Sequence, residues 1–197
     1  MTAEASPTEA AVLVGHATRL PGKFDLVLDG RSVLDRVLLA VRHAGFRPTI
    51  VSVPGSGRTG PSVVVDRYDR GPLGGVRSFL ETRPGPFLLV GGDMPFVRPA
   101  DLRALGRRFQ RGRSVVPRWA DGTFEVLLAV YDLPLDRVRA AWDAGRSLQY
   151  LVADADARGE VLAVPVEEFD PRSLLDLDTP SDVARWRESP GRGVDQD

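Results

Sequence analysis

Residues 87–95 read Phe-Leu-Leu-Val-Gly-Gly-Asp-Met-Pro, an apolar run that ends in two glycines and an aspartate. A continuous apolar run of this length, bounded by glycine, is typical of a strand that is buried on both faces of a sheet. Asp93 follows this strand directly, where a carboxylate is well placed to bind Mg²⁺. An aspartate just before Pro95 is equally compatible with a simple turn. The sequence leaves both interpretations of Asp93 open.

Similar apolar runs occur along the chain and alternate with segments of helical spacing. Besides residues 87–90, we expect strands at 11–14, 49–53, 62–65, 114–116, 126–131, 161–164 and 174–177. The expected helices are 32–44, 72–82, 99–111, 134–144 and 180–187, and the last four have proline in the first turn. Continuous apolar strands that alternate with amphipathic helices predict an α/β fold with a mostly parallel sheet covered on both faces. Short connections between residues 114 and 164 favour some antiparallel members, and therefore a mixed sheet.

Length and composition limit the class of protein. The 197 residues fit one domain, which we expect at 10–188, with flexible segments at 1–9 and 189–197 that hold too little apolar material to pack. A net charge of −1 argues against a dedicated nucleic-acid binder, and no apolar run approaches the roughly 20 residues that span a bilayer. The chain has no cysteine, and its start lacks the basic and apolar regions of a secretory signal. We therefore expect a cytoplasmic protein without nucleic-acid or membrane partners.

Lys23 is the only lysine among 26 basic residues, and it lies in the loop after the first expected strand. Backbone N–H groups of such a loop, together with the cations of Arg19 and Lys23, can surround a polyphosphate. The loop is not a Walker A motif, because six residues separate Gly15 from Gly22 and Phe24 follows the lysine. The alternative is an ordinary connection with a solvated lysine. An ammonium on a phosphate is poorly replaced by the larger, planar guanidinium, which favours a specific role for Lys23.

The third expected strand ends at Asp66 and leads to Gly71-Pro72 and then to Gly74-Gly75. Small residues at the start of a helix let a ligand approach the backbone closely. A turn with proline in the first helical position explains the same residues without a ligand. Both interpretations stay open here.

Four polar residues near the C-terminus have two different expected roles. Thr179 and Asp182 suit the N-cap and N3 positions of the last helix, with Pro180 between them. Asp176 and Asp178 alternate along the expected last strand and therefore share a face. The sequence leaves open whether Asp178 lines a pocket.

Taken in order, these elements resemble the molybdenum cofactor guanylyltransferase family. The motifs that carry the resemblance are residues 12–15 with Arg19 and Lys23, Asp66 before Gly-Pro-Leu-Gly-Gly at 71–75, residues 88–95 ending in Asp-Met-Pro, Glu-Val-Leu-Leu-Ala-Val-Tyr at 125–131, and Asp-Thr-Pro at 178–180. The resemblance covers most of the expected domain. It implies a three-layer, Rossmann-like nucleotidyltransferase fold.

The resemblance also implies a reaction. The phosphate of (Mo-)molybdopterin would attack the α-phosphorus of GTP and release pyrophosphate, with transient contacts to other molybdenum cofactor assembly proteins. Leu13, Val14 and Gly15 would hold the guanine end of GTP through backbone groups, and Ser52 and Asp66 would contact the nucleoside. This assigns GTP and molybdopterin as the small-molecule substrates.

The catalytic residues implied by the resemblance are Arg19, Lys23 and Asp93. Lys23 would contact the phosphates, and Asp93 would bind the Mg²⁺ cofactor and orient the triphosphate. Two other functions stay open: a molybdopterin cytidylyltransferase, and a non-catalytic relative that binds a nucleotide or cofactor during cofactor assembly. The second alternative is motivated by His16, which stands where the family's loop has a second glycine and so brings a side chain to a place of free backbone approach.

Overall fold

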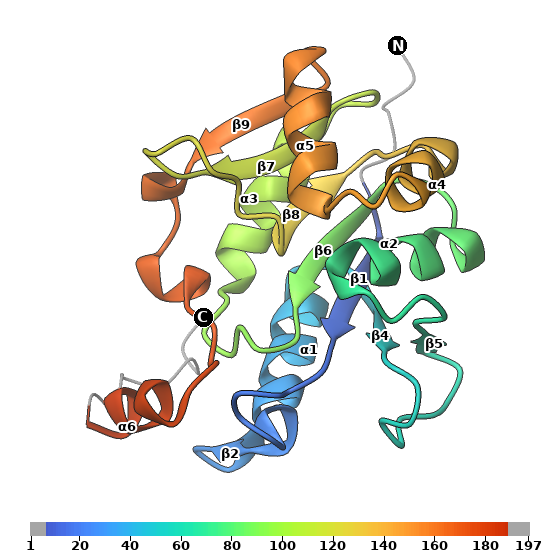
Figure 1. Cartoon of the computed structure of the whole chain (residues 1–197). Coiled ribbons are helices and arrows are strands. Elements are labelled where there is room, and N and C mark those ends of the chain that lie inside the picture. Colours follow the sequence, from blue (N-terminus) through green and yellow to red (C-terminus); the bar gives the residue numbers. More distant parts are fainter. Residues whose placement is uncertain (1–6, 189–197) are drawn as a thin grey trace.

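A seven-stranded sheet forms the centre of the computed structural model, which describes residues 7–188 (Figure 1). The strand order is β5-β4-β1-β6-β8-β7-β9. The strands are β1 (Glu9–Val14), β4 (Arg47–Ser52), β5 (Val63–Val65), β6 (Phe87–Gly91), β7 (Ser114–Arg118), β8 (Leu128–Tyr131) and β9 (Val161–Pro165). The pairs β4–β5, β1–β4, β1–β6 and β7–β9 are parallel, and β8 is antiparallel to both of its neighbours. This confirms the mostly parallel mixed sheet.

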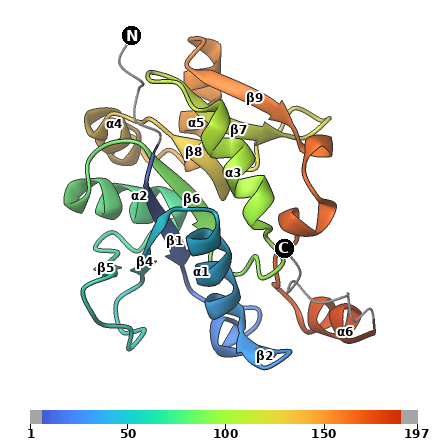
Figure 2. The ribbon, with the colours of Figure 1, turned by 180° about the vertical axis from the view of Figure 1, so that it is seen from behind.

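Helices cover both faces of the sheet (Figures 1 and 2). The helices are α1 (Val33–His43), α2 (Gly71–Thr82), α3 (Pro99–Arg108), α4 (Leu135–Asp143), α5 (Leu148–Ala157) and α6 (Pro180–Glu188). Apolar residues of α1 and α3 pack in one core cluster, and those of α2, α4 and α5 pack in the other. Strand residues alternate between the two clusters, with Val12 in the first and Ala11 in the second. The three-layer α/β fold is therefore confirmed.

A small third core cluster holds the segment that precedes α6. Leu177 packs with Leu28 and Val33, which belong to a short hairpin of β2 (Val27–Leu28) and β3 (Arg31–Ser32) and to the start of α1. The Leu177 backbone N–H also donates to the Asp93 carbonyl oxygen at 2.9 Å. These contacts fix residues 176–178 beside the end of β6.

The strand expected at residues 174–177 is wrong. Pro171–Leu174 form a 3-10 helix (η3), and the next residues are irregular up to α6. The Leu177 N–H bonds to a loop carbonyl and its side chain is buried in the third cluster, so this segment has no neighbouring strand to pair with. The capping of α6 is as expected: Thr179 Oγ1 accepts from the Asp182 N–H, and Asp182 Oδ2 accepts from the Thr179 N–H.

The sequence interpretation missed α5 and misplaced two ends. Ser147 caps α5, and apolar residues at 148, 151, 152 and 155 are buried at regular helical spacing. The α3 helix ends at Arg108 rather than at residue 111, because Phe109 adopts an extended conformation. Glu9, which we expected in the flexible N-terminal segment, begins β1, while residues 1–6 and 189–197 lie outside the described part. Within residues 7–188, no helix is both long and apolar enough to cross a membrane.

Candidate functional site

A cavity of about 500 Å³ lies at the carboxyl ends of the parallel strands β5, β4, β1 and β6. Neighbouring strands are about 4.8 Å apart, so the ends of β5 and β6 are separated by about 14 Å, which suits an elongated ligand. Most of the expected site residues line this cavity, namely Leu13, Val14, Gly15, Arg19, Lys23, Asp66 and Asp93. The fold thus brings together residues that are up to 80 positions apart in the sequence.

Lys23 lies at the β6 end of the cavity, between two carboxylates. Its Nζ donates to Asp93 Oδ2 at 2.6 Å and to Asp178 Oδ1 at 2.6 Å, and the residue is only 6% exposed. Burial alone would lower the Lys23 pKa, but the hydrogen bonds to Asp178 and Asp93 outweigh it and the pKa is raised. Lys23 is therefore a charged ammonium in a nearly closed position, and the interpretation of a freely solvated lysine is wrong.

Three carboxylates gather at this end of the cavity. Asp176 and Asp178 join Asp93 in the lining, and Arg19 makes an ion pair with Asp178 Oδ2 at 2.7 Å. The pKa of Asp176 is raised, because burial disfavours its charge and because Asp178 and Asp93 repel it. Two cations thus face three carboxylates. The question left open for Asp178 is settled, since its side chain lines the cavity and binds both cations.

Glu125 lies near this acidic group. Burial raises the pKa of its carboxyl group, and the negative charges of Asp176 and Asp93 raise it further, against hydrogen bonds from the Leu127 N–H and the Trp119 side chain. Glu125 is thus a further acidic group at this end of the site, where a bound cation would be stabilised.

These residues fit a Mg²⁺ ion that is bound together with substrate phosphates. Within the described residues, no group of three or more His, Asp or Glu side chains could hold a metal ion by itself. Mg²⁺ usually takes only one or two carboxylates and completes its shell with water and phosphate oxygens. Asp93 bonds to Lys23 through Oδ2, which leaves Oδ1 for such a ligand, and the acids outnumber the cations around it.

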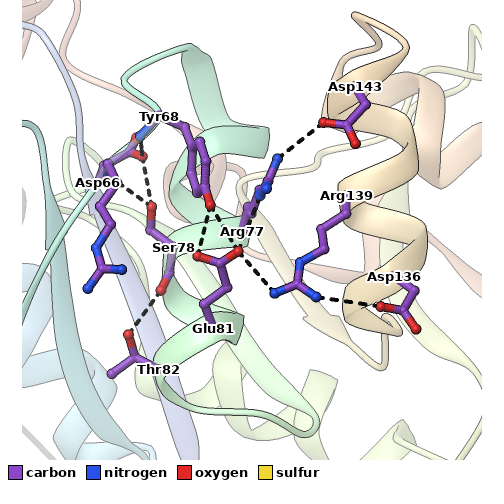
Figure 3. Close-up of polar contacts among 10 residues, drawn as sticks. Asp66, Tyr68, Arg77, Ser78, Glu81, Thr82, Asp136, Arg139 and Asp143 are labelled. Atoms are coloured by element: carbon purple, nitrogen blue, oxygen red, sulfur yellow. Dashed lines mark hydrogen bonds and ion pairs between the residues drawn. The ribbon is translucent and has the colours of Figure 1, made fainter.

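Asp66, which Figure 3 shows with its hydrogen-bond partners, lies at the other end of the cavity, directly after β5. It is 6% exposed, and its Oδ1 accepts hydrogen bonds from the Tyr68 N–H and from the Ser78 hydroxyl, both at 3.0 Å. The Ser78 hydroxyl in turn accepts from the Arg67 N–H at 3.1 Å. Asp66 therefore has a fixed orientation, as a ligand-binding carboxylate requires.

Ser52 is the one expected site residue that does not line the cavity. Its neighbours Val51 and Val53 do. The Ser52 hydroxyl instead donates to Ser56 Oγ at 2.8 Å, and the residue is 1% exposed. A contact of Ser52 with the nucleoside stays a prediction.

Two glycines of the site have opposite roles, and their substitution tests this. A Cβ at Gly92 would lie 2.7 Å from the Leu13 carbonyl oxygen, so Gly92→Ala is expected to lower the free energy of unfolding by about 2 kcal/mol. A Cβ at Gly15 would have no atom within 4 Å and would project into the open site. Gly15→Ala should therefore keep the stability and weaken nucleotide binding several-fold. Chemical denaturation and calorimetric titration of both variants check this, and equal destabilisation by both would contradict it.

A hydrogen bond between His16 and Asp69 bridges the cavity, and the sequence interpretation missed it. His16 Nε2 lies 2.7 Å from Asp69 Oδ1, and both residues line the cavity. The bridge joins the loop after β1 to the loop after β5. Asp69 has a positive φ of 43°, which is unusual for a residue other than glycine. The only hint in the sequence is an acidic residue two positions before Gly71-Pro72.

Comparisons with known proteins agree with this geometry. Residues 10–168 match the family model described as the MobA-like NTP transferase domain. The probable molybdenum cofactor guanylyltransferase of Opitutus terrae is 31% identical over 184 residues, which cover 85% of this chain and 90% of the relative. The corresponding protein of Pyrococcus horikoshii is 31% identical over 132 residues, which cover 62% of this chain and 68% of the relative.

Solved structures show the same architecture. Molybdopterin-guanine dinucleotide biosynthesis protein A from Archaeoglobus fulgidus has a TM-score of 0.73 at 26% identity, covering 91% of this chain and 97% of its own. The 4-diphosphocytidyl-2C-methyl-D-erythritol synthase from Anaerococcus prevotii has a TM-score of 0.71 at 11% identity, covering 95% of this chain and 97% of its own. At that identity the second likeness shows the fold alone.

Proposed function

The chain belongs to the MobA-like NTP transferase family and is a nucleotidyltransferase, and we propose that it transfers GMP from GTP to the phosphate of (Mo-)molybdopterin, with release of pyrophosphate. The observation that carries the proposal is the β6 end of the cavity, where Lys23 and Arg19 face Asp93 and Asp178. The names of the similar guanylyltransferases support the choice of GTP and molybdopterin.

Charge decides how the nucleotide lies in the cavity. The triphosphate belongs at the β6 end, where Arg19 and Lys23 supply positive charge and Asp93 would hold Mg²⁺. The nucleoside belongs at the β5 end, near Asp66, because both cations of the lining, Arg19 and Lys23, pair with carboxylates at the β6 end and neither pairs with Asp66. The separation of about 14 Å between these strand ends suits a nucleoside triphosphate.

The side chains act mainly by positioning and by neutralising charge, as in phosphoryl transfer generally. An ammonium has three N–H donors, of which Lys23 uses two for Asp93 and Asp178. The third donor is free for a phosphate oxygen, so that one residue both orients the carboxylates and binds substrate. When bound, Mg²⁺ supplies further positive charge to the phosphates through Asp93.

The test is a set of parallel reactions. The full chain is incubated with Mg²⁺, molybdopterin and one nucleoside triphosphate at a time, and pyrophosphate release is measured with and without the acceptor. Acceptor-dependent release with GTP alone is the expected result. Release with CTP alone would make the protein a molybdopterin cytidylyltransferase, and nucleotide binding without release for any triphosphate would support a non-catalytic relative.

A further inference from the structure

We propose that Asp69 recognises the base of the bound nucleotide and that His16 holds it in position for this contact. This inference rests on the proposed function only in taking a nucleoside triphosphate as the ligand. Asp69 would accept hydrogen bonds from two adjacent N–H donors of the base, an arrangement that guanine offers at N1 and N2.

The location of Asp69 is the first argument. It lines the cavity in the loop after β5, three residues after Asp66, whereas both cations of the lining, Arg19 and Lys23, pair with carboxylates at the β6 end. Because neither cation pairs with Asp69 to offset its charge, the part of a nucleotide that lies near Asp69 is the part that carries N–H or O–H donors rather than the phosphates. Asp66 is 6% exposed and directly follows the strand, whereas the Asp69 side chain is 41% exposed and lies farther out along the loop. This places the ribose nearer to Asp66 and the base nearer to Asp69.

The conformation of Asp69 is the second argument. Its φ of 43° is in the left-handed region, which costs free energy for most residues and is tolerated best by asparagine and aspartate. A strained backbone of this kind persists only where its surroundings fix it. In this conformation the Asp69 carboxylate lies 2.7 Å from His16 Nε2, and the residue lines the cavity.

The residues on both sides of Asp69 supply that fixation, and Figure 3 shows the contacts of one of them, Tyr68, with Arg77 and Glu81. The Tyr68 ring lies 5.2 Å from the Trp142 ring, its face is covered by Arg77 at 4.0 Å, and its hydroxyl donates to Glu81 at 2.9 Å. Arg70, on the other side of Asp69, packs on the same tryptophan: its guanidinium lies 5.0 Å from the Trp142 ring centroid. Both flanking side chains are thus anchored to α2 and α4, and Asp69 between them is left to face the cavity.

Glu81, which accepts the hydrogen bond from the Tyr68 hydroxyl, is held in turn by Arg77 and Arg139 (Figure 3). Burial would raise the Glu81 pKa, but hydrogen bonds from Tyr68, Arg77 and Arg139 outweigh it and the pKa is lowered. Glu81 therefore stays ionised and keeps its contact with the Tyr68 hydroxyl. The loop that carries Asp69 is in this way preorganised rather than ordered by the ligand.

His16 occupies one lone pair of the Asp69 carboxylate and leaves the others free. Its Nε2 contacts Oδ1, and an ionised carboxylate has about four acceptor positions on its two oxygens. Two adjacent N–H groups of a base can therefore still bond to the two oxygens side by side, as in bidentate recognition of bases elsewhere. Cytosine offers one amino donor beside an acceptor nitrogen, which a carboxylate would repel. An Asp69 carboxylate held by His16 would therefore bind guanine in preference to cytosine.

The experiment measures nucleotide affinity without an acceptor. Calorimetric titration with Mg²⁺ compares GTP, inosine triphosphate (which lacks the 2-amino group), 2′-deoxy-GTP and CTP on the wild-type protein, Asp69→Asn and His16→Ala. Asparagine also tolerates a positive φ, so Asp69→Asn preserves the backbone. Asp154→Asn on α5, outside the cavity lining, is the matched control.

We expect Asp69→Asn to lower the GTP affinity about tenfold and to reduce the preference for GTP over inosine triphosphate toward one, with the same loss for 2′-deoxy-GTP. His16→Ala should lower the GTP affinity by a smaller factor while part of that preference remains, as suits a positioning residue. An unchanged preference in Asp69→Asn would overturn the proposal. So would a loss that disappears with 2′-deoxy-GTP, because the contact would then be to the ribose.

The same titrations separate this proposal from the proposed reaction. Selective GTP binding that depends on Asp69, without pyrophosphate release in the presence of molybdopterin, would overturn the reaction and support the role of Asp69. If the wild-type protein turns over GTP but Asp69→Asn keeps an unchanged preference for GTP, the proposed reaction would be supported and the role of Asp69 would be overturned. Tighter binding of CTP than of GTP by the wild-type protein would overturn both.

Discussion

Replacing Asp93 by asparagine is expected to lower turnover at least a hundredfold, which corresponds to about 2.7 kcal/mol in activation free energy. Asp93 lies two residues after the end of the buried strand β6, where it bonds to Lys23 and lines the proposed triphosphate site. Asparagine keeps the shape and removes the charge. The loss therefore measures how much the negative charge at this position contributes to Mg²⁺ binding and to the alignment of the phosphates.

Steady-state pyrophosphate release at increasing Mg²⁺ concentrations tests this expectation. The variant should need more Mg²⁺ for half-maximal rate, and its maximal rate should stay low. Asp136→Asn is the matched control, since the Asp136 side chain is 96% exposed on α4 and outside the cavity lining. A variant at Asp93 that turns over at a wild-type rate with unchanged Mg²⁺ dependence would remove Asp93 from the catalytic residues.

The position of Asp93 in the cavity lining could be predicted because its signal is local. A buried parallel strand must end at the edge where ligands bind, so an aspartate directly after it is placed by the strand itself. The same reasoning placed Gly15 after β1 and Asp66 after β5, and all three residues line the cavity. Strands with continuous apolar runs were likewise predictable, because the spacing of apolar residues along the sequence indicates which residues are buried.

Features that depend on distant contacts were not predictable in the same way. The irregular conformation of residues 175–179 depends on a hydrogen bond from Leu177 to the Asp93 carbonyl, which no local pattern reveals. The bond of the Ser52 hydroxyl to Ser56 depends on how the loop after β4 folds, which the pattern of the strand does not reveal. The α5 helix is a different case, because its regular apolar spacing and its cap at Ser147 are both visible in the sequence, and the interpretation overlooked the whole helix.

The partners of Lys23 show the same limit at the centre of the site. The sequence indicates that the single lysine is special, but not that two aspartates, 70 and 155 positions away, bind it. The resemblance assigned Lys23 to the phosphates alone. The structure adds that the ammonium also separates two carboxylates that would otherwise repel each other, which gives Lys23 a role in stability as well.

Lys23→Met is therefore expected to affect both stability and turnover. Removing one member of a buried ion pair leaves the other uncompensated, so the free energy of unfolding should fall by about 3 kcal/mol. Turnover per folded molecule should fall at least thirtyfold, because a phosphate contact and the orientation of Asp93 are both lost. Chemical denaturation gives the first quantity, and pyrophosphate release at a temperature where the variant is folded gives the second.

Two further variants separate charge from shape. Lys23→Arg keeps the positive charge but must fit a planar guanidinium into a site that is 6% exposed, so it should recover part of the stability and little of the turnover. Arg47→Met is the control for losing an exposed ion pair, since the Arg47 side chain is 74% exposed beside Glu9, and it should cost less than about 1 kcal/mol.

Mg²⁺ gives a third readout that depends on the carboxylates themselves. Without the ammonium, Asp93 and Asp178 have lost a cation that both of them contact, so added Mg²⁺ should raise the melting temperature of Lys23→Met more than that of the wild-type protein. An equal rise in both proteins would show that these carboxylates do not attract the metal. A Lys23→Met protein with wild-type stability would show that the ammonium does not hold the carboxylates in place, and the phosphate contact would then be its only role.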